Sequence, residues 1–214
     1  LHFICPSKWI AEMAKRSSLI KNYPIYTIPN AYPIDILKPQ NKDESRLKLG
    51  LPLKRKLILF GADSLSNKRK GGDILHNVIM RYIKIHGKNS IEAVMFGNNN
   101  LDLPIKCHNV GFISIHMLPV LYSAVDVFVS TSIEDVGPMT VGESMLCGTP
   151  VVAFPIGIMP EIATHKYSGY IAEQYSSEDF KNGIEWAIIN NTENRELSLR
   201  CRSDALKYCD PENC

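Results

Sequence analysis

Three acidic side chains stand close together in the segment 126–155, which reads DVFVSTSIEDVGPMTVGESMLCGTPVVAFP. Glu134 and Asp135 follow an apolar run that opens at Asp126, and Glu143 lies on the helix that we predict next. Carboxylates at the carboxyl edge of a parallel strand, beside the start of a helix, form ligand sites in open α/β sheets. An ionised carboxylate also accepts strong hydrogen bonds from hydroxyl groups. The alternative is a solvated acidic loop and a glutamate that the helix dipole favours.

The loop from Val136 to Thr140 leads into that helix. The N–H groups in the first turn of a helix have no partner within the helix, and they suit a diphosphate. Gly137 allows the backbone to approach a ligand closely, Pro138 fixes the turn, and Met139 follows at the start of the helix. We therefore predict phosphate binding by this loop. For Thr140 the alternative is a plain N-cap.

Lys68, Arg69 and Lys70 precede two glycines on the loop after a buried strand at residues 56–61. A basic side chain at the carboxyl edge of a sheet can neutralise the charge that develops on a leaving phosphate. The alternative is a solvated basic turn before a helix. Two further strands end in glycine, at Gly97 and at Gly111, and Phe112 follows the second as either a core or a contact residue.

Strands and helices alternate along the whole chain. The strands read as nearly continuous apolar runs, which is typical of a parallel sheet covered by helices on both faces. The predicted fold is therefore α/β, a doubly wound parallel sheet. Strands are expected at 2–5, 24–29, 56–61, 91–97, 107–112, 126–130, 150–154 and 168–172, and the first of them reads as buried. Ser7 is expected to cap a helix at about 8–20 that has Met13 on its apolar face, and Asp43 or Glu44 to start a helix that stops at Gly50. A long helix is expected after Gly71 and Gly72, with an apolar face from Ile74 to Ile83, and further helices at about 115–124, 139–147, 158–164, 177–190 and 193–208.

Composition excludes several classes of protein. The formal net charge of +2 over 214 residues gives no reason to expect nucleic acid as a partner. No apolar run approaches the roughly 18 residues of a membrane helix. The six cysteines and the scattered histidines lack zinc spacing, so we expect no metal and reduced thiols in a cytoplasmic protein. The sequence contains neither a P-loop nor a G-x-G-x-x-G motif.

The segment 126–155 resembles the acid-x7-Glu motif of retaining glycosyltransferases with the GT-B fold, of the family-four type. Asp135 and Glu143 occupy the two acidic positions, and ESMLCGTPVVAF resembles that family's helix and next strand. The resemblance implies that residues 1–40 are the end of an N-terminal acceptor-side domain and a linker. Residues 41–214 would then be the nucleotide-sugar-binding, Rossmann-like domain, which is the C-terminal half of the two-domain fold and is truncated at its own C-terminus.

The resemblance also implies roles for the acidic residues. Glu143 would hold the ribose of the donor, and Asp135 would contact the transferred sugar. The family usually has Glu at the first position, and members with a paired Glu-Asp suggest that Glu134 shares the role. Asn30, in IPNAY, resembles a structural IPNG element, and Gly157 to Glu161 resemble a Gly-Gly-x-Pro-Glu turn with Ile158 in place of the second glycine.

An Arg-x4-Lys pair neutralises the diphosphate in the family, and Lys70 matches its lysine. Its arginine has no match, since Ala62 or Asp63 stands near that place, and Lys68 or Arg69 would have to compensate. Gly111 and Phe112 fall where the family contacts the nucleobase. Gly97 matches a family glycine at the end of its strand.

The function expected from the resemblance is transfer of a sugar from a nucleotide-diphosphate sugar to an acceptor hydroxyl, with retention, in polysaccharide or glycoconjugate synthesis. The donor is a substrate, and no cofactor is expected. The acceptor would be a sugar or a lipid-linked glycan. The location would be the cytoplasm, with contact to the inner face of the membrane through the missing domain. The alternatives are an inactive nucleotide-sugar-binding module and a GT-B enzyme similar to nucleotide-sugar 2-epimerases.

Overall fold

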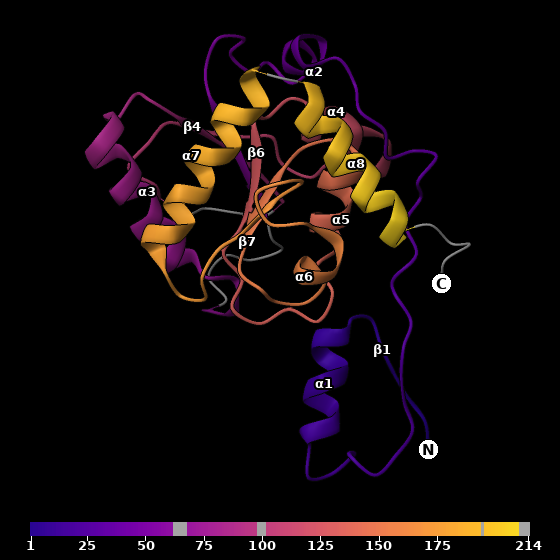
Figure 1. Cartoon of the computed structure of the whole chain (residues 1–214). Helices are drawn as coiled ribbons and strands as arrows, with labels where there is room; N and C mark the ends of the chain where they lie inside the picture. The colour runs from indigo at the N-terminus through magenta and orange to yellow at the C-terminus, as the bar shows by residue number, and fades with distance from the viewer. Residues whose placement is uncertain (62–67, 98–101, 194, 210–214) are drawn as a thin grey trace.

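The computed structural model describes residues 1–61, 68–97, 102–193 and 195–209 (Figure 1). Its main sheet has six parallel strands in the order β5-β4-β3-β6-β7-β8. The strands are β3 (Leu57–Gly61), β4 (Glu92–Phe96), β5 (Cys107–Asn109), β6 (Val127–Ser130), β7 (Val151–Ala153) and β8 (Tyr170–Ile171). The chain builds outward from β3 to one edge and then from β6 to the other, so the strand order reverses between these two strands. The predicted doubly wound parallel sheet is confirmed.

Side chains alternate between the two faces of the sheet, and each face is covered by its own helices. Leu57 and Leu59 belong to one buried cluster, whereas Ile58 and Phe60 belong to the other. The first face packs against α4 (Leu118–Ser123), α5 (Met139–Leu146) and α8 (Arg195–Cys209), and the second against α3 (Gly72–His86) and α7 (Ser177–Glu193) (Figure 1). This alternation places apolar residues on both sides of every central strand, which explains the nearly continuous apolar runs.

The first residues form a small unit of two parallel strands and one helix. It contains β1 (Phe3–Cys5), α1 (Lys8–Arg16) and β2 (Ile25–Thr27), and it lies apart from the main sheet beside α6 (Met159–Ile162) (Figure 1). Its buried residues are Cys5, Ala11 and Ala14. The prediction of a wholly buried first strand is wrong at Ile4, which is 65% exposed, and Met13 on the predicted apolar face is 50% exposed.

Two predicted elements end earlier than expected, and polar side chains explain both. Ser7 caps α1 as predicted, but the helix ends at Arg16 because Ser17 has extended backbone and accepts a hydrogen bond from Leu19 N. Strand β5 ends at Asn109, whose side chain accepts a hydrogen bond from Gly111 N at 2.9 Å. The turn bends the chain there, so the regular strand stops short of the predicted residue 112, although Val110 N still donates to Met95 O and Gly97 N to Gly111 O.

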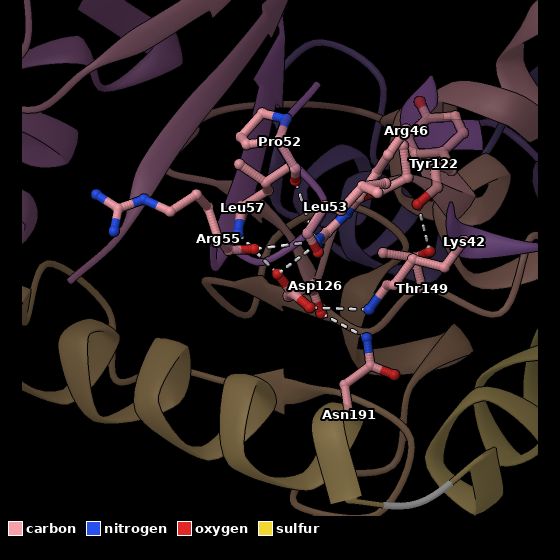
Figure 2. Close-up of polar contacts among 11 residues, drawn as sticks. Lys42, Arg46, Pro52, Leu53, Arg55, Leu57, Tyr122, Asp126, Thr149 and Asn191 are labelled. Atoms are coloured by element: carbon pink, nitrogen blue, oxygen red, sulfur yellow. Dashed lines mark hydrogen bonds and ion pairs between the residues drawn. The ribbon is translucent and has the colours of Figure 1, made fainter. Parts of the chain in front are cut away.

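A buried ion pair lies at the amino edge of the sheet, and sequence analysis did not identify it. Arg46 Nη2 donates to Asp126 Oδ2 at 3.0 Å, and Leu57 N donates to the same oxygen at 2.7 Å (Figure 2). Helix α2 (Lys42–Lys48) delivers Arg46, and it begins before the predicted Asp43 or Glu44 because Asn41 caps it. Lys42 donates to the other oxygen of Asp126.

The guanidinium of Arg46 also satisfies backbone carbonyls. Its Nε donates to Ala124 O, and Nη1 donates to Leu53 O and Arg55 O (Figure 2). Because the charges and the carbonyls are all paired, the arrangement is a structural anchor that ties α2 and the strand starts together. It lies at the end of the strands opposite to the loops that carry the predicted ligand-binding residues.

Candidate functional site

A cavity of about 350 Å³ lies at the carboxyl edge of the sheet, beside the point where the strand order reverses. In open α/β sheets, ligands bind in the crevice outside the carboxyl ends of the strands at this position. Most of the predicted site residues line the cavity. They are Lys70, Gly97, Phe112, Asp135, Gly137, Pro138, Met139 and Thr140, together with Gly61, Phe96 and Ile113, which sequence analysis did not identify.

Lys70 and Asp135 form an ion pair in this cavity. Lys70 ends a short 3-10 helix (Lys68–Lys70) that follows β3, and Asp135 lies in the loop after β6. The ammonium donates to Asp135 Oδ2 at 2.7 Å, and both side chains are partly buried. The two loops that bracket the reversal of strand order therefore meet through opposite charges.

Backbone contacts hold these two loops against each other. Thr131 Oγ1 donates to Lys70 O at 3.1 Å and to Gly71 O at 3.0 Å. Gly71 has a positive φ of 68°, and a Cβ there would stand 2.0 Å from Thr131 O. Glycine is therefore required at this position both by its backbone conformation and by the closeness of the neighbouring loop.

Helix α5 starts at the cavity without a side-chain cap. Pro138 is the N-cap residue, with φ −63° and ψ 103°, and Thr140 lies inside the helix. The alternative interpretation of Thr140 as an N-cap is therefore wrong. The first-turn N–H groups of α5 are of the kind that bind anionic groups, and residues 137–140 line the cavity beside Lys70.

Glu143 lies one helical turn further along α5, outside the described lining of the cavity. Its Oε2 accepts a hydrogen bond from the hydroxyl of Tyr122 at 2.8 Å. Burial raises the pKa of Glu143, and the Tyr122 hydroxyl partly opposes this by stabilising the carboxylate. The structure thus separates the second acid from the Lys70–Asp135 pair and gives it a partner that the sequence did not indicate.

Phe112 and two glycines define another side of the cavity. Phe112 is 84% exposed, so the alternative that it belongs to the core is wrong. Gly97 N donates to Gly111 O at 2.9 Å, and both glycines have positive φ. Gly111 therefore lies beside the cavity rather than in its described lining, and it fixes the turn that carries Phe112.

Other predicted residues lie away from the cavity or outside the described part of the chain. Glu134, Lys68 and Arg69 are exposed and do not belong to the lining that the described residues form. Ala62 and Asp63, which stand near the family's arginine position, lie outside the described residues. The glycine that sequence analysis missed, Gly61, leaves room for the ring of Phe96, since a Cβ there would stand 2.0 Å from that ring.

The described residues, 1–61, 68–97, 102–193 and 195–209, also bear on metal binding and on membrane insertion. None of these residues form a cluster of three or more His, Cys, Asp or Glu side chains suited to a metal ion. His108 instead contacts Glu92 at 2.7 Å. No helix in these ranges combines the length and the apolar character needed to cross a bilayer.

Comparison with solved structures places the fold among glycosyltransferases. Sucrose-phosphate synthase from Thermosynechococcus elongatus matches with a TM-score of 0.82 and 20% identity, over 99% of this chain and 55% of that one. HepE from Anabaena, in complex with UDP and glucose, matches with a TM-score of 0.75 and 20% identity, over 95% of this chain and 58% of that one. TarM from S. aureus, crystallised with UDP among its ligands, matches with a TM-score of 0.73 and 17% identity, over 98% of this chain and 41% of that one.

This chain thus spans between about two fifths and three fifths of the length of these structures. None of the curated proteins matches it. Residues 41–207 match the sequence profile of the family described as Glycosyl transferases group 1. Because the match covers most of the chain, this protein belongs to the glycosyl transferases group 1 family.

Proposed function

We propose that this protein binds a nucleotide-diphosphate sugar in the cavity at the reversal of strand order and takes part in transferring the sugar, with retention, to an acceptor hydroxyl. The observation that carries the proposal is the Lys70–Asp135 ion pair at 2.7 Å, beside the start of α5. The ammonium of Lys70 and the first-turn N–H groups of α5 suit a diphosphate, and the carboxylate of Asp135 suits sugar hydroxyls.

The chemistry follows from where charge develops. When the bond between sugar and diphosphate breaks, negative charge grows on the leaving phosphate. Lys70 and the first-turn N–H groups of α5 would stabilise that charge, because they are already positioned before the reaction. Asp135 would orient the sugar hydroxyls, and Glu143 would bind the ribose from its position further along α5. A donor phosphate would compete with Asp135 for the ammonium of Lys70.

A UDP-sugar is the first donor to test, because HepE and TarM were each crystallised with UDP. We propose a sugar or a lipid-linked glycan as the acceptor, in polysaccharide or glycoconjugate synthesis in the cytoplasm, where the inner face of the membrane could be contacted through a further domain. Complete transfer would require that domain, since the matched structures are considerably longer than this chain.

Isothermal titration calorimetry of this chain with UDP, GDP, ADP and CMP tests the proposal. We expect one nucleoside diphosphate to bind in preference to the others, and Glu143→Ala to weaken that binding. Glu134→Ala is the matched control, because Glu134 is an exposed acid outside the described lining. If no nucleotide binds, or if the two variants behave alike, the donor site does not lie here.

A donor-binding module without transfer activity is the second candidate. The hydroxyl of Tyr122 donates to Glu143 outside the described cavity lining, so the charged side chains within that lining are Lys70 and Asp135. This smaller set of charged groups favours a module that binds the donor without transferring its sugar. A transfer assay on the protein as it occurs in the cell, with the preferred donor, separates the two candidates. Release of the nucleoside diphosphate only when an acceptor is added would support transfer, and binding without release would support the module.

A further inference from the structure

The loop that carries Asp135, which we call the Asp135 loop (residues 131–138), is held from outside the main sheet. Ser7 Oγ donates to Val136 O at 2.7 Å, across 129 residues of sequence. Asn30 Nδ2 lies 3.5 Å from Gly137 O as a second, longer hydrogen bond. Both partners belong to the first thirty residues, which form the small unit of β1, α1 and β2 and the segment after it.

The bond from Ser7 is connected to the ion pair through one peptide group. A trans peptide directs its carbonyl and its N–H to opposite sides. Because Ser7 engages the carbonyl of Val136, the N–H of Gly137 is directed the other way, and it donates to Asp135 Oδ1 at 3.2 Å. The other oxygen of Asp135 accepts from Lys70. One chain of hydrogen bonds therefore runs from Ser7 through the peptide to Asp135 and Lys70.

The side chains around these hydrogen bonds leave little space for a side chain at Gly137, whereas the side chain of Val136 is loosely packed. Ser7 is fully buried, whereas the side chain of Val136 is 50% exposed and contributes little to anchoring the loop. A Cβ at Gly137 would stand 3.2 Å from Asn30 Nδ2 and 3.3 Å from a side-chain carbon of Pro6. The loop is therefore positioned mainly through its backbone, and the small N-terminal unit supplies the partner.

We infer that Ser7 is a positioning residue of the donor site, which acts through the Val136–Gly137 peptide to orient the Asp135 carboxylate toward Lys70. The inference rests on the proposed donor site and adds a residue to it. Hydrogen bonds in such a chain polarise one another, so a change at Ser7 is transmitted to Asp135. Movement of the small N-terminal unit relative to the main sheet then alters the Asp135 loop directly.

The substitution Ser7→Gly tests this inference, because glycine retains most of the N-cap stability of α1 while removing the hydroxyl. Asn41→Gly is the matched control, since Asn41 caps α2 in the same way at a distance from the cavity. Nuclear magnetic resonance of the ¹⁵N-labelled chain reads the Gly137 amide, and calorimetry reads the affinities for the preferred diphosphate and for the corresponding nucleotide sugar. Ser7→Thr, which retains a hydroxyl, is the rescue.

We expect Ser7→Gly to shift the Gly137 amide resonance and to speed its hydrogen exchange. Because Asp135 is proposed to contact the sugar and competes with the phosphate for Lys70, the variant should bind the nucleotide sugar about fivefold more weakly relative to its diphosphate, which corresponds to one neutral hydrogen bond. Asn41→Gly should change none of these, and Ser7→Thr should restore them. An unchanged Gly137 amide in Ser7→Gly, or an equal ratio of the two affinities in the two glycine variants, would overturn the inference.

Failure of the proposed function gives a different result. If no nucleotide binds the unmodified chain, the donor site is refuted, and the Gly137 amide alone then decides whether Ser7 orients the loop. A melting curve checks that every variant folds. Should Ser7→Gly not fold, Ser7→Cys retains the side-chain volume with a weaker donor, and the same amide shift is expected of it.

Discussion

The ammonium of Lys70 and the carboxylate of Asp135 meet at 2.7 Å although they belong to loops that follow two different strands, β3 and β6. These strands are neighbours only because the chain reverses its direction of sheet building between them. The pair therefore spans the position where a doubly wound sheet opens to a ligand. In the proposed donor site, a diphosphate would compete with Asp135 for the ammonium of Lys70.

Lys70→Met should lower the affinity for the preferred nucleoside diphosphate by about tenfold to a hundredfold, as expected for the loss of a charged hydrogen bond. The loss is increased by Asp135, whose charge would then face the phosphate without its partner. Calorimetry at low and at high salt measures the effect. Lys68→Met removes an exposed charge from the same 3-10 helix and should change the affinity much less. Equal effects of the two variants would mean that only the overall charge matters.

Glu143→Gln should raise the melting temperature at pH 7 while it weakens the binding of the diphosphate. Burial raises the folded-state pKa of Glu143 above its ordinary value of 4.5, so a carboxylic acid at this position costs stability at pH 7 relative to an uncharged side chain of the same shape. This cost develops as the pH rises from 4.5 through the folded pKa. The variant and the unmodified chain should therefore melt alike below pH 4.5, and a gain that persisted at low pH would contradict the explanation.

Glu92→Gln should show the opposite dependence on pH. Burial raises the pKa of Glu92, but the hydrogen bonds from His108 and Arg55 outweigh this and leave it below 4.5. A lowered carboxyl pKa stabilises the fold above the unfolded-state value, and that stability is lost as the pH falls through the folded pKa. We expect Glu92→Gln to lower the melting temperature at pH 7 and to match the unmodified chain in acid. Melting curves recorded over the same pH series as for Glu143→Gln provide the comparison.

Arg46→Met should lower the free energy of unfolding by about 3–5 kcal/mol, because it leaves the buried carboxylate of Asp126 without its principal partner. Lys42→Met removes the more exposed partner of the same carboxylate, and it should cost about 1 kcal/mol or less. Urea denaturation measures both. Diphosphate affinity should be unchanged wherever Arg46→Met is folded, because the anchor lies at the opposite edge of the sheet. A loss of affinity would mean that the anchor and the proposed donor site are coupled across the sheet.

Tyr32→Phe and Tyr122→Phe should change stability in opposite directions. The buried hydroxyl of Tyr32 has no hydrogen-bond partner among the described residues, so its removal should raise the free energy of unfolding by about 1 kcal/mol. The hydroxyl of Tyr122 donates to Glu143, and its removal should lower the free energy of unfolding by about 2 kcal/mol. Urea denaturation distinguishes them. A loss in Tyr32→Phe would reveal a partner of its hydroxyl.

The sequence predicted the sheet well because each strand carries its own signal. The runs at 57–60 and 127–129 are apolar at consecutive positions, and this pattern indicates a strand that is covered on both faces. Glycines at strand ends and the proline before α5 likewise act locally, so residues 137–140 could be assigned to one loop. Most of the cavity lining followed from these local signals.

Contacts between distant residues carried no such signal. Nothing in the pattern around Asp126 indicates that Arg46, which lies 80 residues earlier, supplies its partner. The same holds for Tyr122 and Glu143, and for Tyr32, whose ring packs so closely on α5 that a Cβ at Gly142 would stand 2.5 Å from it. Local polar competition also shifted element ends, as at Ser17. Such features depend on tertiary packing, which a single sequence does not display.

The first forty residues, which include Ser7, also contact the last helix, α8, and these contacts form late in synthesis on the ribosome. Pro6 O accepts a hydrogen bond from the hydroxyl of Tyr208, 202 residues later, and Leu37 O accepts one from Arg202. At about 5–20 residues per second, the first strand and helix wait roughly 10–40 s before these partners are made. Throughout that interval the carbonyls of Pro6 and Leu37 remain without these partners, so the first forty residues reach their final contacts only when the last helix has been made.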